Sequence, residues 1–382
     1  MIYLDNAATT FPKPNIVSEK MYECMREYCA NPGRGGHLLS VRASKEVINT
    51  RFLIGELFNI PNIMNICFTK NATEAINIAI KGLLNENDHV ITTKMEHNSV
   101  IRPLRVLERD RNIQISFINS NEYGEIDLEH LESLIKDNTK LIVTTLSSNV
   151  NGIVMPVQKI GEIAQKNNVL FLLDASQGAG AIPLDVQKMN IDIMALPGHK
   201  GLYGPQGTGV LYIREGINVK PLMEGGTGSK SEYIYQPEIL PDEHESGTLN
   251  TPGIVGLGAG ISYIKEYGIE NIQKYKHSLI ERLYNGICDL DVIKIYSKID
   301  IDNNSGILAL NFKDVDSNEI GYILDKIYDI QVRAGLHCAP MAHDTLGTKD
   351  IGGIVRFSVG IFNTVEEIDK TIEAIREIAE NM

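Results

Sequence analysis

Residues 196–209, LPGHKGLYGPQGTG, place a single lysine, Lys200, directly after a histidine and among five glycines. A lysine on an ordinary surface does not need glycine neighbours. A backbone that must come close to something bulky does need them, because glycine has no Cβ and adopts dihedral angles that other residues avoid. The pattern therefore predicts a ligand held near a reactive amine.

Two further side chains that could do chemistry follow apolar runs typical of strands. Asp174 ends the run VLFLLD, where a carboxylate could cap a helix, bind a metal or face a cationic ring nitrogen. The segment ASQGAGAIP after it offers no companion carboxylate or histidine, so we expect no metal. His97 follows the run DHVITTK and is either structural or a ring that stacks on a flat ligand.

The segment NATEAIN has the features of a helix N-terminus that could hold a phosphate. Asn71 is the expected cap, Glu74 stands three residues later, and Thr73 lies between them. Free N–H groups and the helix dipole favour an anion at such an end, although a plain cap explains the same residues. His199 could donate to the same phosphate.

Taken together, these groups match the needs of pyridoxal phosphate. The Lys200 amine could form a Schiff base, and the Asp174 carboxylate could keep the pyridine nitrogen protonated so that the ring accepts electrons from a substrate carbon. His97 offers a ring for stacking, and the helix near Thr73 offers a phosphate site. Each signal is weak alone, but their succession at expected strand ends predicts this cofactor.

The segment RAGLHCAP makes Cys338 a candidate nucleophile. A cysteine is often only a small buried hydrophobe. Here His337 and Arg333 are near in sequence, and positive neighbours lower the pKa of a thiol. The glycine and proline that flank Cys338 favour a loop, so we favour the nucleophile. The remaining cysteines lack such settings and are expected to be structural: Cys24, Cys29, Cys67 and Cys288.

Between residues 64 and 214, short β-rich runs alternate with helical patterns. This alternation predicts a mostly parallel sheet that helices cover on both faces, with ligands bound outside the carboxyl ends of its strands. The expected strands are IMNICFT, DHVITTK, IQISFI, KLIVTTL, VLFLLD, IDIMAL and GVLYI. Residues 215–251 are irregular and rich in glycine and proline, which is typical of a functional segment or a linker.

Helices return after residue 254, followed by the expected strands VIKIYS, GILALNF, IQVRAGL and GIVRFSVG. The last helix should begin after Thr364, with Glu367 completing a capping box. We therefore expect an α/β protein with a large domain over residues 15–250. A smaller domain should combine residues 1–14 with residues 251–382.

Composition narrows the possible partners and compartment. The 36 Lys and Arg against 49 Asp and Glu give a formal charge of −13, which argues against nucleic acid and weakly against an anionic membrane surface. No apolar run has the length of a membrane span, and the start MIYLDNAATTFPKP lacks the features of a signal peptide. The five sparse cysteines do not suggest a disulfide framework, so we expect a soluble cytoplasmic protein.

Several segments, in order along nearly the whole chain, resemble the class V aminotransferase family of fold-type I pyridoxal-phosphate enzymes. They are YLDNAATT, NATEAIN, MEHNSV, LLDASQGAG, GHKGLYGPQGTG, ESGTLNTPGI, RAGLHCAP and VRFSVGIFNT. The chain is most similar to the group II cysteine desulfurases, which include selenocysteine lyase-like members. The resemblance implies the fold of that class, with a seven-stranded sheet in the large domain.

The resemblance also implies how the cofactor and the substrate are held. Lys200 would be the Schiff-base lysine, and the other cofactor contacts would come from Ala72, Thr73, His97, Asp174, Gln177, His199 and Thr248. Among these, Gln177 would bond the ring hydroxyl oxygen, and Thr248 would reach the phosphate of the other subunit in a homodimer. The substrate would meet His37, Asn149, Arg333 and Arg356, of which Asn149 and Arg356 would hold its carboxylate.

The function that the resemblance implies is a cysteine desulfurase. Lys200, Cys338 and His97 would be its catalytic residues, and a persulfide on Cys338 would pass to an acceptor protein, for example in iron–sulfur cluster assembly. Selenocysteine could replace cysteine. The alternatives are an aminotransferase or cysteine β-lyase that does not use Cys338, and a non-catalytic cofactor-binding scaffold.

Two positions depart from the family pattern. The family usually has serine or threonine two residues before the histidine of the HK pair, as a phosphate donor, and this chain has Pro197, which offers neither a hydroxyl nor an N–H. Group II members often carry a second histidine two residues before the cysteine, and this chain has Leu336.

Overall fold

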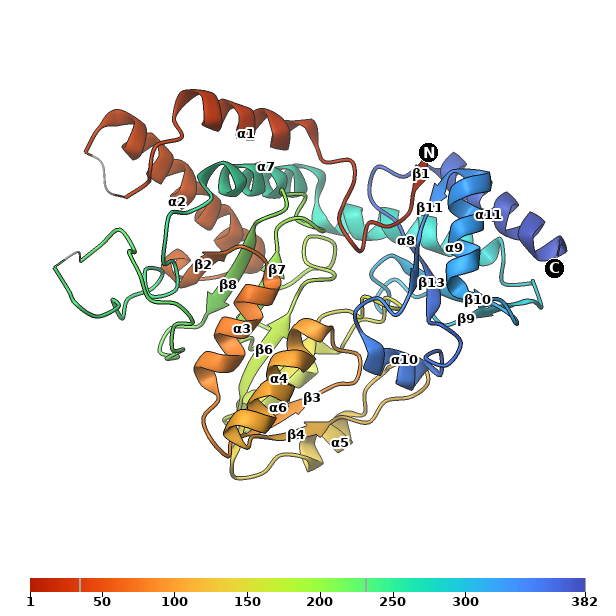
Figure 1. Ribbon diagram of the computed structural model, residues 1–382, viewed down its shortest axis with the longest axis horizontal. Helices are drawn as coiled ribbons and strands as arrows, with labels where there is room; N and C mark the ends of the chain where they lie inside the picture. Colours follow the sequence, from red (N-terminus) through yellow and green to blue (C-terminus); the bar gives the residue numbers. More distant parts are fainter. Residues whose placement is uncertain (34–35, 231, 382) are drawn as a thin grey trace.

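The computed structural model describes residues 1–33, 36–230 and 232–381 (Figure 1). A seven-stranded sheet forms its centre, in the order β2-β8-β7-β6-β5-β3-β4. The strands are β2 (Ile66–Thr69), β3 (His89–Thr92), β4 (Gln114–Phe117), β5 (Thr139–Thr145), β6 (Leu170–Asp174), β7 (Ile193–Pro197) and β8 (Gly209–Ile213). Only β8 runs antiparallel to its two neighbours, β7 and β2, so the predicted mostly parallel sheet is confirmed within the described residues.

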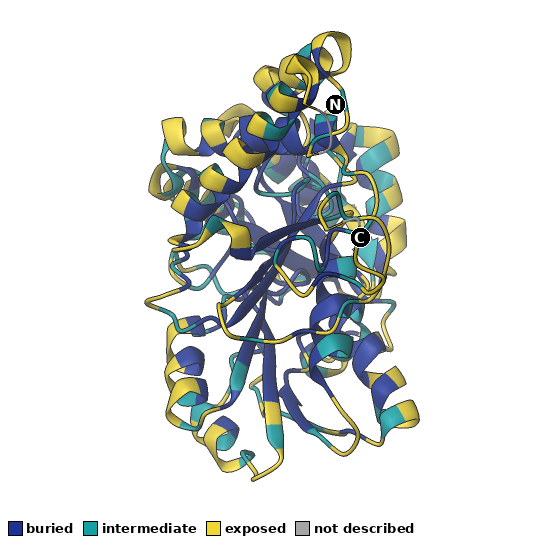
Figure 2. Cartoon of the chain, turned by 90° about the vertical axis from the view of Figure 1, so that its left-hand side faces the viewer, coloured by how far each residue is buried: buried dark blue, intermediate teal, exposed yellow. Residues whose placement is uncertain are grey.

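Helices cover both faces of this sheet because its central strands are apolar on both sides (Figure 2). Side chains of α3 and α4 pack on one face, and those of α2, α6 and α7 pack on the other. The helices of this part are α1 (Asn15–Glu27), α2 (Leu38–Phe58), α3 (Ala72–Leu83), α4 (Asn98–Arg111), α5 (Leu128–Ser133), α6 (Val157–Lys166) and α7 (Thr251–Tyr267), with a 3₁₀ turn at Ile63–Asn65.

A smaller sheet at the right of Figure 1 is antiparallel, in the order β12-β13-β10-β9. Its strands are β9 (Ile293–Ile295), β10 (Ile307–Phe312), β12 (Arg333–Gly335) and β13 (Ile354–Ser358). The nearby helices are α8 (Ile269–Asn285), α9 (Ser317–Tyr328), α10 (Pro340–Leu346) and α11 (Val365–Glu380). The predicted capping box of Thr364 and Glu367 is present at the start of α11.

The first residues of the chain join this smaller unit. β1 (Ile2–Tyr3) pairs in parallel with β11 (Ile330–Gln331), and Leu4 lies in the core formed with α8, α9 and α11. The run IQVRAGL, expected as one strand, is therefore divided: β11 pairs with β1, and β12 pairs with β13. The predicted division into 15–250 against 1–14 and 251–382 stays a prediction. α7, just after that boundary, packs on α1 and α2 and joins the core of the large sheet.

Among the described residues, no helix is both long and apolar enough to cross a bilayer. The irregular segment predicted over residues 215–251 is confirmed for residues 215–230 and 232–250, which contain neither helix nor strand, whereas Thr251 already begins α7; residue 231 lies outside the description.

A buried ion pair anchors this irregular segment to the large sheet. Glu245 accepts from Arg51 of α2 at 2.5 and 2.7 Å and from the Phe68 N–H of β2 at 2.5 Å. Both side chains are about 95 % buried, and Arg51 also donates to the Ile66 carbonyl. Burial raises the pKa of Glu245 in spite of the adjacent guanidinium, so desolvation outweighs the attraction.

We expect Glu245→Gln to destabilise the fold by about 3–5 kcal/mol, because it leaves the buried Arg51 cation without its counter-charge. Urea unfolding at neutral pH measures this loss. The matched control is Asp369→Asn, which breaks an Arg282–Asp369 pair whose side chains are roughly half exposed and should cost about 1 kcal/mol or less. Equal losses in the two variants would contradict the argument.

Candidate active site

Lys200 lies in the loop after β7, and the N-terminal segment holds that loop in place. The Thr10 N–H donates to the His199 carbonyl at 3.2 Å, and the Thr10 hydroxyl donates to the Lys200 carbonyl at 2.9 Å. Burial lowers the pKa of the Lys200 amine to about 8, which outweighs the opposing attraction of Asp174. A neutral amine is therefore accessible near neutral pH, as proton transfer or Schiff-base chemistry needs.

The glycines around Lys200 have a different reason from the one that the sequence suggested. A Cβ on Gly201 would lie 2.2 Å from the Ala179 carbonyl oxygen, and one on Gly198 would lie 2.2 Å from the Thr208 hydroxyl. A Cβ on Gly209 would lie 2.6 Å from the backbone of Asn71. The bulky neighbour at these positions is the protein's own chain. The glycines let the Lys200 loop pack against the turn after β6 and the start of α3.

Asp174 and Gln177 lie where the sequence predicts, at and just after the carboxyl end of β6. Asp174 is 2 % exposed, and its Oδ1 accepts from the Ser176 N–H at 2.9 Å. The negative charge of Asp174 favours the protonated forms of both Lys200 and His97, and so acts to raise their pKa values. Gln177 lines one cavity with Lys200 and donates to the Ala7 carbonyl at 2.7 Å. The structure therefore brings the predicted acid, amide and amine together.

A chain of hydrogen bonds joins His97 to the start of α3. His97 caps α4, and its Nδ1 accepts from the Ser99 N–H at 3.0 Å and lies 2.9 Å from the Ser99 hydroxyl. That hydroxyl is 2.8 Å from the Thr73 hydroxyl, one residue after the buried Ala72 that begins α3. Asn71 caps α3 as predicted. Ser99 was missed, although a hydroxyl two residues after a capping histidine is a visible signal.

The two histidines of the site are neutral near pH 7. Burial lowers the pKa of His97 in spite of the opposing attraction of Asp174. Burial also lowers the pKa of His199 to about 4, helped by the charges of Lys200 and Lys13. His199 Nδ1 lies 3.1 Å from the Thr9 hydroxyl. A neutral His97 ring suits stacking, and a neutral His199 offers a single N–H donor.

Asp5, for which no role was predicted, joins the two predicted substrate arginines. Arg356 of β13 is 3 % exposed and donates through Nη2 to Asp5 Oδ1 at 2.7 Å and through Nη1 to the Asn149 carbonyl at 2.6 Å. Arg333 donates through Nε to Asp5 Oδ2 at 3.1 Å. Among the described atoms, Arg356 Nε is buried without a partner. The structure thus places three of the predicted substrate-binding residues close together: Asn149, Arg333 and Arg356.

Cys338 lies on a strained, exposed turn that contacts both sides of this region. His337 and Cys338 have φ angles of 48° and 58°, in the left-handed region that side chains rarely adopt. The Asn98 N–H donates to the Cys338 carbonyl at 2.8 Å, and the Asn149 amide donates to the His337 carbonyl at 2.6 Å. The turn is therefore tied to the residue after His97, and the side chain of Cys338 faces solvent.

The idea that His337 is a cation beside the thiol is wrong. His337 is 7 % exposed, and burial holds its pKa well below the usual value, so the imidazole is neutral. It stacks on His343 with ring centroids 5.8 Å apart. Arg333, the other expected positive neighbour, pairs with Asp5. His337 shapes the turn through packing and does not supply charge.

The predicted residues Thr248 and His37 lie at exposed positions. Among the described residues, no hydrogen bond joins either of them to another predicted site residue. Thr248 is exposed and lines another cavity beside Asn31 and Pro32, and His37 is exposed and caps α2. Of the two departures from the family pattern, Pro197 is buried at the end of β7 and Leu336 is exposed.

Comparison with known proteins shows the family of this chain. The family model for aminotransferase class-V matches residues 2–371. The chain belongs to the aminotransferase class-V family. It is 38 % identical to a probable cysteine desulfurase from Methanothermobacter thermautotrophicus, covering 99 % of this chain and 94 % of that one, and 31 % identical to a cysteine desulfurase from Yersinia pestis, covering 99 % and 93 %.

A solved structure is similar along its whole length. The apo structure of a cysteine desulfurase from Thermococcus onnurineus superposes with a TM-score of 0.94 at 33 % identity, covering all of this chain and 95 % of that one. The class of fold predicted from the sequence is therefore confirmed.

Glu96, directly before His97, is a buried acid that the sequence did not single out. It is fully buried, and its Oε1 accepts from the Thr93 hydroxyl at 2.7 Å and the Thr145 N–H at 3.0 Å. Among the described atoms its Oε2 has no partner. Burial raises the pKa of Glu96 to about 8, and the charge of Asp174 adds to the rise. A neutral Glu96 adds no negative charge beside Asp174.

This shift predicts a pH-dependent stability. Between the ordinary pKa of 4.5 and about 8, folded Glu96 binds a proton that the unfolded chain has released, so its contribution to stability falls as pH rises. Compared with Glu96→Gln, which cannot ionise, the wild type should lose up to about 1.4 kcal/mol per pH unit in this range. Urea unfolding from pH 5 to 8 measures the difference.

The matched control is Glu122→Gln, at an exposed position nearby in the sequence. Its stability should follow the wild-type pH dependence. If Glu96→Gln also follows the wild type, Glu96 is ionised in the folded protein and its pKa is not raised.

Proposed function

We propose that this chain is a pyridoxal-phosphate-dependent cysteine desulfurase, which converts L-cysteine to L-alanine and leaves a persulfide on Cys338. The single observation that carries the proposal is the 2.8 Å hydrogen bond from the Asn98 N–H to the Cys338 carbonyl. It ties an exposed cysteine to the residue next to His97, in the site of Lys200 and Asp174. The names of the relatives support the same reaction.

The residues present fit the cofactor. Lys200 offers an amine with a lowered pKa, and the buried Asp174 offers a carboxylate for a cationic ring nitrogen. The start of α3 offers free N–H groups, and the Thr73 and Ser99 hydroxyls lie together beside it. We infer that Ser99 supplies the hydroxyl donor that Pro197 lacks. The bound cofactor would accept the electron pair that is released at the substrate's Cα.

Arg356 and Asn149 would orient the substrate through its carboxylate. A guanidinium binds a carboxylate through two parallel hydrogen bonds, and Arg356 has a buried Nε without a partner among the described atoms. Asp5 and the Asn149 carbonyl fix the other side of this guanidinium. The arginine is therefore held in position before substrate arrives.

The chemical steps on the protein then fall to two side chains. Lys200, as a neutral amine, would remove the proton from Cα and later return a proton to the product. The Cys338 thiolate would attack the substrate sulfur: the new S–S bond forms, the Cβ–S bond breaks, and its electron pair is protonated at Cβ to give alanine. An acceptor thiol would then take the outer sulfur and restore Cys338.

Two alternatives use the same residues differently. An aminotransferase or cysteine β-lyase would need Lys200 and Arg356 but not Cys338, and the contact between the Cys338 turn and α4 gives no support to it. A non-catalytic scaffold would not need a desolvated amine, which Lys200 provides. Selenocysteine would react by the same steps.

The proposal also includes a cellular compartment and a sulfur acceptor. We infer a cytoplasmic enzyme that passes sulfur to an acceptor protein, with iron–sulfur cluster assembly as a process that uses it. The exposed turn of Cys338 supports transfer to a protein acceptor, because a bulky partner can approach the thiol.

We also infer a homodimer in which Thr248 and His37 serve the site of the other subunit, since both are exposed in a single chain. Exposed apolar side chains on α2 and the irregular segment, such as Leu38, Phe52 and Ile234, suit such an interface. Sedimentation should find the activity in a species of twice 42.4 kDa. Full activity in a monomer would contradict this arrangement.

We expect Cys338→Ala to lose most of its sulfide production from cysteine, while borohydride still links the cofactor to Lys200. Removing a nucleophile should lower the rate by a factor on the order of 100 or more. Alanine and sulfide assays measure the loss, and mass spectrometry of the wild type after one turnover should find an added sulfur on the Cys338 peptide.

The matched control is Cys288→Ala, which removes another exposed cysteine, located in the smaller unit. It should keep wild-type activity. Full alanine and sulfide production by Cys338→Ala would overturn the persulfide mechanism on Cys338, and pyruvate and ammonia in place of alanine would indicate the lyase alternative.

A further inference from the structure

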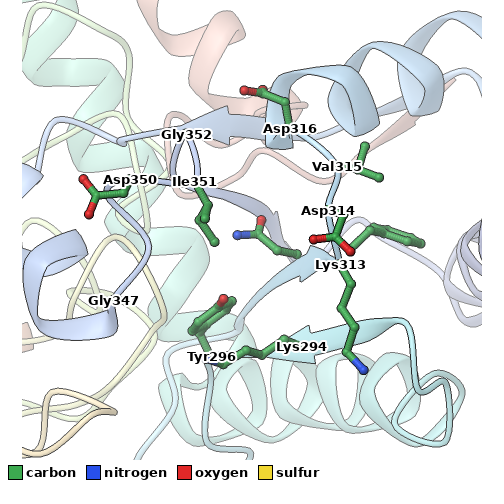
Figure 3. A pocket seen from close by; sticks show the side chains of 12 residues that line it. Lys294, Tyr296, Lys313, Asp314, Val315, Asp316, Gly347, Asp350, Ile351 and Gly352 are labelled. Atoms are coloured by element: carbon green, nitrogen blue, oxygen red, sulfur yellow. The ribbon is translucent and has the colours of Figure 1, made fainter.

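A second cavity, of about 610 Å³, lies on the smaller sheet (Figure 3). Its lining residues do not overlap with those of the Lys200 cavity. One side of the cavity comes from β9 and β10, where Lys294 and Asn311 are direct partners on neighbouring antiparallel strands and so project from the same face. The loop after α10, with Asp350 and Ile351, forms the opposite wall.

Asn311 is the most buried of the polar residues that line this cavity. It is 4 % exposed, and its Nδ2 donates to the Gly353 carbonyl at 2.7 Å. Among the described atoms its Oδ1 has no hydrogen-bond donor. A buried carbonyl oxygen without a donor costs on the order of 1–3 kcal/mol, so a ligand N–H at this position would stabilise both partners.

The charges around Asn311 have both signs. The ammonium of Lys294 lies 5.0 Å from the centre of the Tyr296 ring, and Lys313 is the second cation. Carboxylates come from Asp314, Asp316 and Asp350. A simple anion would meet three carboxylates here, and a simple cation would meet two ammonium groups. A small molecule that carries one charge of each sign satisfies both sets.

We propose that this cavity binds a free α-amino acid. The ligand's ammonium group donates to Asn311 Oδ1 and faces the carboxylates, its carboxylate faces Lys294, and a small side chain lies between Tyr296 and Ile351. The site is separate from the one that holds the substrate, and the proposal does not depend on the function proposed above.

The test uses holoenzyme treated with borohydride, so that Lys200 can no longer exchange its cofactor linkage for an amino acid. Methyl NMR then follows two isoleucines: Ile351 in the cavity, and Ile182, whose Cδ1 would lie 2.8 Å from a Cβ on Gly178 near Lys200. The probes are L-alanine, propionate and ethylamine. L-Alanine should shift Ile351 in a saturable way, and each singly charged probe should bind at least about tenfold more weakly.

Variants make the assignment specific. Lys294→Gln and Asp350→Asn change exposed groups on the rim and should each weaken alanine binding about tenfold, and a folded Asn311→Leu should abolish it. The matched control, Lys349→Gln, removes an exposed lysine next to the cavity wall that pairs with Asp344, and it should bind as the wild type does. The proposal is overturned by an unsaturable Ile351 shift, by equal affinity for the three probes, or by rim variants that bind like the control.

Discussion

The Asp5 carboxylate between Arg333 and Arg356 is the contact on which the site depends. These arginines are direct partners on neighbouring antiparallel strands, a placement in which like charges repel. Asp5 accepts a hydrogen bond from each arginine, at 3.1 and 2.7 Å. Its negative charge offsets their repulsion and holds the two guanidinium groups together. The segment after it then reaches Gln177 and Lys200. One carboxylate thus links the first residues, the last strand and the reactive lysine.

Desolvation sets the protonation of the groups that this bridge assembles. Burial lowers the pKa of Lys200 to about 8 and that of His199 to about 4, and it raises the pKa of Glu96 to about 8. The result is an amine that can exchange a proton near neutral pH, beside neutral histidines and a neutral acid. Asp174 supplies the anionic counterpart, which is the condition for holding a protonated pyridine nitrogen.

Most of the large sheet could be predicted because its signals are local. Its strands are short β-rich runs, those from β2 to β6 are separated by helices, and the caps at Asn71 and Thr364 depend on residues three apart. The division of the run IQVRAGL could not be predicted, since β11 pairs with β1 more than 300 residues away. Pairing between distant segments leaves no local pattern.

The sequence names the residue types that could do chemistry, but it does not show which of their side chains are buried. The charges in the site were therefore harder to predict than its candidate residues. Sequence proximity made His337 a cation beside Cys338, but His337 is buried and neutral, and Arg333 is bound to Asp5. The turn contributes in another way. Its two left-handed residues are held by the Asn98 N–H and the Asn149 amide, one on each side. Those bonds oppose the strain and direct the thiol outward, where a substrate sulfur and an acceptor can both reach it.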